Sequence, residues 1–107
     1  MSTIQPTTPP LADALPSEDE LVVSVVIPCL NEEENIEACV TKALTAMREA
    51  NIPGEVVVAD NASEDRSAEL ARAAGARVVT ETRRGYGSAY LAGFAASRGL
   101  YIVRADA

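Results

Sequence analysis

Hydrophobic positions along the chain follow two patterns that alternate. Short runs rich in β-branched residues, without polar alternation, predict buried strands at 21–28, 55–59, 76–80 and 100–104. Between these runs, apolar residues recur at the 3.6-residue spacing of amphipathic helices, most clearly from Ile36 to Met47. Because the connections are short, the order β-α-β-α-β-α-β requires parallel pairing. We therefore expect an α/β fold, a Rossmann-like parallel sheet of about four strands with helices on both faces.

Capping and turn residues predict where the helices begin and end. Asn31 and Glu34 have the spacing of a capping box, which predicts that the first helix begins there. Ser63 is expected to cap the second helix, and Gly75 to end it in the left-handed conformation. The third helix is expected at residues 88–98.

The two ends of the sequence differ in character from the middle. Residues 1–20 are rich in proline, serine and threonine, so we expect a disordered N-terminal arm, followed by one domain over 21–107. Neither a signal peptide nor a transmembrane segment is expected. Folds of this kind normally continue with further strands, so we expect the sequence to be truncated at its C-terminus.

Composition excludes several classes of chemistry. The 107 residues contain no histidine, which excludes the Ser-His-Asp triad, histidine-ligated zinc and an imidazole base. Sixteen acidic against nine basic residues give a net charge of −7, which disfavours nucleic acid as a partner. The two cysteines match neither a metal clip nor a disulfide framework, so we interpret them as reduced thiols of a cytoplasmic protein.

Polar and conformationally special residues follow each predicted strand. In open parallel sheets, ligands bind beyond the carboxyl ends of the strands, so these residues are candidates for a binding site. They are, in chain order, Pro28, Leu30, Asn31, Glu32, Asp60, Asn61, Ser63, Asp65, Arg83, Arg84, Gly85, Gly87 and Asp106.

Four segments at these strand ends resemble a known family. They are VVIPCLNEEENI at 25–36, VVVADNAS at 56–63, RRGYGSAY at 83–90 and YIVRADA at 101–107. Together they resemble the nucleotide-binding half of family 2 glycosyltransferases with the GT-A fold, and most of all the polyprenyl-phosphate (dolichyl-phosphate) sugar synthases. The resemblance covers residues 21–107.

The resemblance implies a role for each matching residue. Asp60 would contact the nucleobase, while Pro28, Leu30 and Glu32 would line the nucleoside pocket and Val58 would border it. Each carboxylate also has a purely structural interpretation. Asp60 can close an Asx-turn before Ser63, and Glu32 can be a charge in the first turn of a helix.

The loop at 83–88 is a candidate anion site. Arg84, with the backbone N–H groups around Gly85 and Gly87, can approach a diphosphate or an acceptor phosphate at a helix N-terminus. The loop lacks the third glycine of a dinucleotide fingerprint and follows the third strand rather than the first, which disfavours an NAD-dependent dehydrogenase. A surface loop with solvated arginines is the structural alternative.

Asp106 matches the first carboxylate of the Asp-x-Asp motif of the family. The resemblance implies that it helps to hold a divalent cation, Mg²⁺ or Mn²⁺, against the donor diphosphate. The sequence ends at Ala107, within that motif, so we expect the 107-residue chain to be inactive on its own and assign no catalytic residue within it.

The resemblance predicts a glycosyltransferase that moves a hexose from a UDP- or GDP-sugar, and the acceptor that fits best is a polyprenyl phosphate. The cytoplasmic face of a membrane is then the expected location. The alternative is a module that binds a nucleoside diphosphate without chemistry. A nucleotidyltransferase is disfavoured because no glycine-rich loop follows the first strand.

Overall fold

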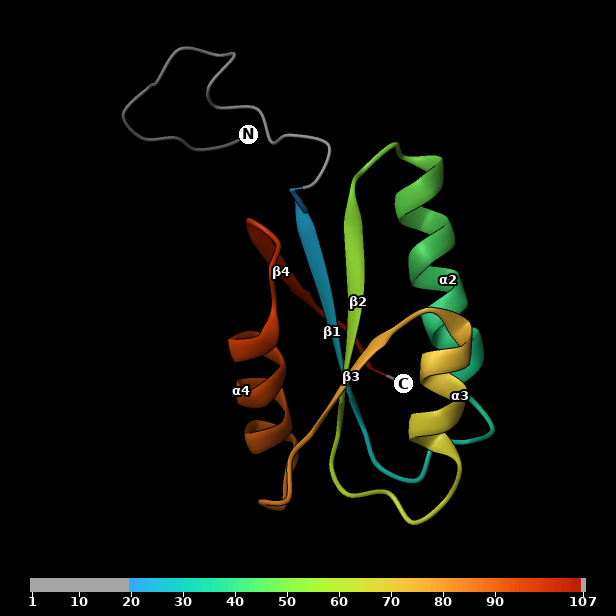
Figure 1. The fold of residues 1–107 in the computed structure, drawn as a ribbon, viewed down its shortest axis with the longest axis vertical. Helices are drawn as coiled ribbons and strands as arrows, with labels where there is room; N and C mark the ends of the chain where they lie inside the picture. The colour runs from blue at the N-terminus through green and yellow to red at the C-terminus, as the bar shows by residue number, and fades with distance from the viewer. Residues whose placement is uncertain (1–19, 107) are drawn as a thin grey trace.

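The structure, a computed structural model, describes residues 20–106. Strands and helices alternate along the chain, and Figure 1 shows α4 on one side of the sheet and α2 and α3 on the other. The elements are β1 (Val23–Cys29), α2 (Ile36–Glu49), β2 (Gly54–Asp60), α3 (Ser67–Ala74), β3 (Arg77–Thr80), α4 (Tyr86–Ala96) and β4 (Tyr101–Arg104). The predicted α/β fold with helices on both faces is confirmed.

All strand pairings in the sheet are parallel, and the strands lie in the order β3-β2-β1-β4. Cys29 pairs with Asp60, and Asp60 pairs with Thr80, so β1, β2 and β3 end at the same level. β4 pairs along the first part of β1, where its last residue Arg104 lies opposite Val26. This register brings the loops after β1, β2 and β3 to one edge of the sheet.

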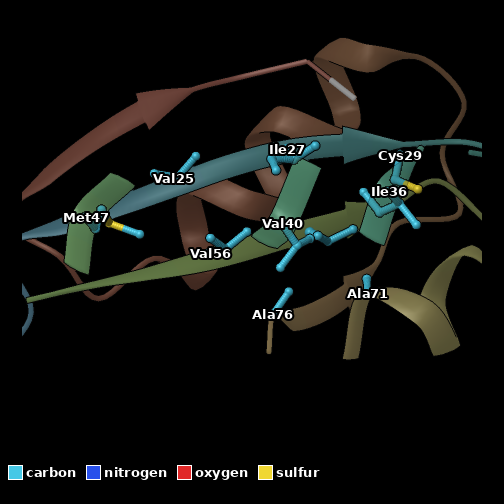
Figure 2. Close-up of a cluster of buried hydrophobic side chains, with 10 residues drawn as sticks. Val25, Ile27, Cys29, Ile36, Val40, Met47, Val56, Ala71 and Ala76 are labelled. Carbon is cyan, nitrogen blue, oxygen red and sulfur yellow. The ribbon is translucent and has the colours of Figure 1, made fainter. Parts of the chain in front are cut away.

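Helices α2 and α3 cover one face of the sheet. Val25, Ile27 and Cys29 of β1 point to this side, as Figure 2 shows, and pack against α2 through Ile36 and Val40. Alternate residues of each strand therefore face this core, although both faces are buried. A continuous β-branched run is the expected sequence pattern for such a strand.

Helix α4 covers the opposite face at close range. Val26 and Val57 are fully buried there, beneath Ala89 and Gly93 of α4. A Cβ atom added at Gly93 would collide with the side chain of Val26, so the close approach of this helix requires glycine. The edge strand β4 is different, because its side chains are exposed, including Tyr101, Ile102 and Val103.

Two predicted helix starts are wrong. Helix α2 begins at Ile36 instead of Asn31, and Asn31 adopts a left-handed backbone with φ of 53°. Helix α3 begins at Ser67, four positions after the predicted cap Ser63. In both cases the polar side chain bonds to the neighbouring loop rather than to its own helix, so tertiary contacts override the local capping signal.

Of the remaining local predictions, the end of α3 is confirmed and the start of α4 is wrong by two residues. Gly75 ends α3 with φ of 113°, as predicted for a left-handed stop. Helix α4 begins at Tyr86, before the predicted start at residue 88. The predicted arm at 1–20 lies outside the described residues, apart from Glu20. Both cysteines are free thiols, and burial raises the pKa of Cys29.

Candidate functional site

The carboxyl ends of the strands carry the candidate residues. Residues 30–35 follow β1, 61–66 follow β2, 81–85 follow β3, and Ala105 and Asp106 follow β4. Because β1, β2 and β3 end at the same level, the first three segments lie close together at one end of the sheet. Glu32, Asp60 and Arg84, which are far apart in the sequence, thus belong to one rim. β4 ends earlier, opposite Val26, and Asp106 lines a different hollow with Lys42 of α2.

A cavity of about 180 Å³ opens between the first three of these segments. Its lining combines two apolar side chains with two amides, a hydroxyl, a carboxylate and a cation, so it offers a ligand apolar contact, hydrogen-bonding groups and one positive charge. Leu30 and Arg84, both predicted from the sequence, come together here. The lining residues are Leu30, Asn31, Asn61, Ala62, Glu64, Thr82 and Arg84.

The loops after β1 and β2 are joined by hydrogen bonds. The N–H of Asn31 donates to Ser63 Oγ at 2.9 Å, and the N–H of Glu32 donates to Ser67 Oγ at 2.7 Å. In return, Asn31 Oδ1 accepts from the N–H of Glu64 at 2.9 Å. These bonds take up backbone groups that no strand or helix satisfies, and they preorganise one wall of the cavity.

Glu32 lies outside this cavity. It lines a neighbouring hollow of about 250 Å³ beside the start of α2, together with Asn31, Glu33, Glu34, Asn35 and Asp65. Asp65 accepts from the N–H of Glu33 at 3.2 Å and from the N–H and hydroxyl of Ser67. Desolvation acts to raise the pKa of Asp65, but the bonds from Ser67 outweigh it and hold the pKa below its ordinary value. The nucleoside role of Glu32 stays a prediction.

Asp60 makes a local contact with Ser63, as its structural interpretation predicts, but the bond reaches the backbone three residues on, one more than in an Asx-turn. Its side chain is buried, and its two oxygens accept from the N–H of Ser63 at 3.0 Å and from Ser63 Oγ at 2.6 Å. A carboxylate has about four acceptor sites, so this contact leaves capacity for a further donor. Contact between Asp60 and a base stays a prediction.

Pro28 and Val58 are buried within their strands. Val58 belongs to the core beneath α2, and Pro28 pairs with Ala59 in the centre of the sheet. Neither is among the described residues that line the cavity. Both stay predictions for the nucleoside pocket.

The two neighbouring arginines of the β3–α4 loop have different environments. Arg83 pairs with Glu81, with 2.9 Å between Nη2 and Oε1, and its hydrogen bonds hold the pKa of Glu81 at about 2. Arg84 faces the cavity. Gly85 has φ of 110°, a left-handed value that favours glycine, whereas a Cβ atom at Gly87 would meet open space. The sequence did not distinguish the two arginines.

Sequence reasoning missed the role of Asn61. Its buried side chain bonds to the β3–α4 loop at three points, through Glu81, Arg83 and Gly85. The signal was present, because an asparagine directly after a buried strand can both donate and accept. No sequence pattern identifies its partners, which lie about twenty residues further along the chain.

Asp106 follows β4 and is exposed. Tyr90 of α4 donates to Asp106 Oδ1 at 3.0 Å, and the Arg104 guanidinium lies 5.0 Å from the centre of the Tyr90 ring. Desolvation and this bond to Asp106 raise the pKa of Tyr90. Carboxylate oxygen suits Mg²⁺ or Mn²⁺, but residues 20–106 contain no group of three or more potential ligands. Asp106 can therefore be one ligand, not a metal site by itself.

The parallel sheet and the rim of loops place the chain among proteins with the GT-A fold. Glucosyl-3-phosphoglycerate synthase from Mycobacterium tuberculosis, solved with Mn²⁺, UDP and glucosyl-3-phosphoglycerate, is 33% identical with a TM-score of 0.67. That alignment covers 80% of this chain and 33% of the synthase. Mannosyl-3-phosphoglycerate synthase from Rubrobacter xylanophilus is 26% identical with a TM-score of 0.74, over 81% of this chain and 30% of that enzyme.

The sequence comparisons define the family. Residues 24–107 match the model of glycosyl transferase family 2, and the chain belongs to this family. It is 47% identical to the low-salt glycan biosynthesis hexosyltransferase Agl6 of Haloferax volcanii, over 79% of this chain and 20% of that protein. It is 38% identical to undecaprenyl-phosphate 4-deoxy-4-formamido-L-arabinose transferase of Pectobacterium carotovorum, over 79% of this chain and 28% of the transferase.

The chain therefore spans about a fifth to a third of the length of these relatives. Among residues 20–106, no helix is both long and apolar enough to cross a membrane.

Proposed function

We propose that residues 21–107 form the donor-nucleotide-binding half of a glycosyltransferase. The donor is a hexose linked to UDP or GDP, and the acceptor is a polyprenyl phosphate. The observation that carries the proposal is the cavity at the carboxyl edge of the sheet, where Arg84 and Leu30 meet in a chain of glycosyl transferase family 2. The apolar side chain can contact a ring, and the guanidinium can pair with a diphosphate.

The binding step uses residues on the rim. Leu30, with the side chain of Asn31, would hold the nucleoside, and Arg84 would neutralise the diphosphate as it becomes the leaving group. Gly85 and Gly87 would allow the start of α4 to approach the phosphates. Asp106 would supply one oxygen to a divalent cation that is also bound by the diphosphate.

Two observations support a polyprenyl phosphate as the acceptor. A phosphate monoester is already anionic at neutral pH, so it can attack the anomeric carbon without a strong base, which suits a chain that has no histidine. One relative is named as an undecaprenyl-phosphate transferase, which supports a lipid phosphate acceptor. The reaction would then take place at the cytoplasmic face of a membrane.

The alternative is a module that binds a nucleoside diphosphate without catalysis. Binding without any dependence on Mn²⁺ would favour this alternative.

Calorimetric titration tests the proposal. UDP and GDP, with and without Mn²⁺, are added to the wild type, to Arg84→Gln and to Arg48→Gln, a control at an exposed arginine near the end of α2. We expect one nucleotide to bind the wild type and the control equally and Arg84→Gln more weakly. A wild type that binds neither nucleotide would refute the proposal. Transfer of a radiolabelled sugar to undecaprenyl phosphate, by this chain and by a longer one, separates the enzyme from the binding module.

A further inference from the structure

The side chain of Asn61 uses three of its hydrogen-bonding positions on a single loop. Nδ2 donates to the carbonyl oxygens of Glu81 and Arg83, both at 2.7 Å. Oδ1 accepts from the N–H of Gly85 at 3.0 Å. An asparagine amide has two N–H donors, so both are in use. The loop is held at Glu81, Arg83 and Gly85, and the last two of these directly flank Arg84.

Asn61 is itself held firmly. It directly follows β2, and its N–H donates to the carbonyl of Cys29 at 2.7 Å, which extends the β1–β2 ladder by one bond. The residue as a whole is 7% exposed. A buried amide that is fixed to the central strands transmits their position to the groups that it bonds.

The three hydrogen bonds between Asn61 and the β3–α4 loop, called the clamp below, hold the backbone on both sides of Arg84. The carbonyl of Arg83 is bound by Asn61, and its guanidinium is bound by Glu81, so Arg83 is anchored at both ends. Arg84 lies between two clamped backbone positions, and it forms no ion pair within the described residues. Asn61 and Arg84 also line the same cavity.

We propose that Asn61 is a positioning residue that holds Arg84 and the N–H groups at the start of α4 toward the diphosphate of a bound nucleotide. This inference rests on the proposed function, because it assigns the anionic end of the same ligand. Preorganised donors bind an anion more tightly than mobile ones, since less freedom is lost on binding. Asn61 therefore controls the affinity for phosphate groups and has little effect on the nucleoside.

The test compares three probes by calorimetry: UDP, uridine and inorganic pyrophosphate. Asn61→Asp keeps an acceptor for the N–H of Gly85 but replaces the two donors by a carboxylate facing two carbonyl oxygens. Asn35→Asp is the matched control, because Asn35 is exposed and its side chain makes no capping hydrogen bond. Asn61→Ser removes the clamp without adding charge, so it serves if Asn61→Asp fails to fold.

Asn61→Asp and Asn61→Ser are expected to weaken UDP binding by roughly tenfold and uridine binding by less than about twofold. The control is expected to bind both as the wild type does. Because Asn61 acts in part through Arg84, the double variant Asn61→Asp/Arg84→Gln is expected to lose less UDP affinity than the sum of the two single losses. A purely structural role would weaken both ligands equally and give additive losses, and either result would overturn the inference.

The same probes separate this inference from the proposed function. A wild type that binds pyrophosphate through Arg84, but does not bind UDP more tightly than pyrophosphate, would refute recognition of the nucleoside and retain the role of Asn61. A wild type that binds UDP, with Asn61 variants that lose nothing, would refute only the positioning role. Failure to bind any of the three probes would overturn both.

Discussion

Ser24 Oγ donates a hydrogen bond of 2.6 Å to Glu55 Oε2, joining β1 to β2 at the end of the sheet opposite the cavity. The same Glu55 oxygen accepts from the N–H of Arg98 at 2.8 Å, and Ser24 Oγ accepts from the N–H of Gly99 at 2.8 Å. Arg77 Nε donates to the other Glu55 oxygen at 2.9 Å. This network fixes the turn from α4 into β4, and with it the path of the strand that leads to Asp106.

Glu55→Gln is expected to destabilise the fold by about 2 kcal/mol at pH 7, because the carboxylate accepts several bonds in a partly buried site. Burial acts to raise the pKa of Glu55, but the bonds from Arg77, Ser24 and the N–H of Arg98 outweigh it and lower the pKa below 4.5. Urea unfolding monitored by circular dichroism measures the effect.

The pH dependence of this effect has a definite sign. A carboxyl whose pKa is lower in the folded state contributes stability above its unfolded pKa, here near 4.5, and that contribution is lost as the pH falls through the folded pKa. The difference between wild type and Glu55→Gln should therefore be constant from pH 6 to 7 and shrink below about pH 4.5. Glu49→Gln, at the exposed end of α2, is the control. A difference that grows in acid would contradict the assignment.

The fold was predictable because its signals are local. Runs of β-branched residues located all four strands to within two residues, and Gly75 marked a helix end through its own backbone preference. The start of α2 was not predictable. The Asn31 side chain bonds to the backbone of Glu64, a residue brought near only by the folded sheet, so its capping signal competed with a contact that the sequence does not reveal.

The candidate site likewise has a part that the sequence predicts and a part that it does not. Leu30 and Arg84 were located by their place after a strand, because topology alone brings strand ends together. The difference between Arg83 and Arg84 depends on which of them reaches Glu81, and the role of Asn61 depends on carbonyl oxygens in another loop. These are side-chain contacts across loops, which neither spacing nor residue type determines.

Arg84→Gln and Arg83→Gln are predicted to differ in their effect on nucleotide binding. Arg84→Gln should weaken UDP binding by roughly tenfold, since it removes the charge that faces the cavity. Arg83→Gln should change it by less than about twofold, because Glu81 still accepts from the N–H of residue 83 at 2.7 Å. Both variants lose one positive charge, so calorimetry on the pair separates position from net charge. Equal losses would show that the effect is non-specific.

Gly93→Ala is predicted to destabilise the fold although alanine is the better helix former. The added Cβ would collide with Val26, and α4 would have to move away from the sheet. Overpacking of this kind costs about 1–3 kcal/mol, more than the gain in helix propensity. The free energy of unfolding in urea measures the balance. An unchanged or raised value would mean that α4 packs less closely than in this structure.

Gly87→Ala separates stability from binding in the same helix. A Cβ atom at Gly87 meets open space in the first turn of α4, so alanine should raise the free energy of unfolding by about 0.5–1 kcal/mol through helix propensity. If the diphosphate approaches the N–H groups of this turn, the new methyl group stands in its path, and UDP binding should fall several-fold while uridine binding is unchanged. Urea unfolding and calorimetry on one protein sample measure both effects. A more stable variant that binds UDP as the wild type does would place the phosphates away from Gly87 and leave Arg84 as the contact that the loop provides.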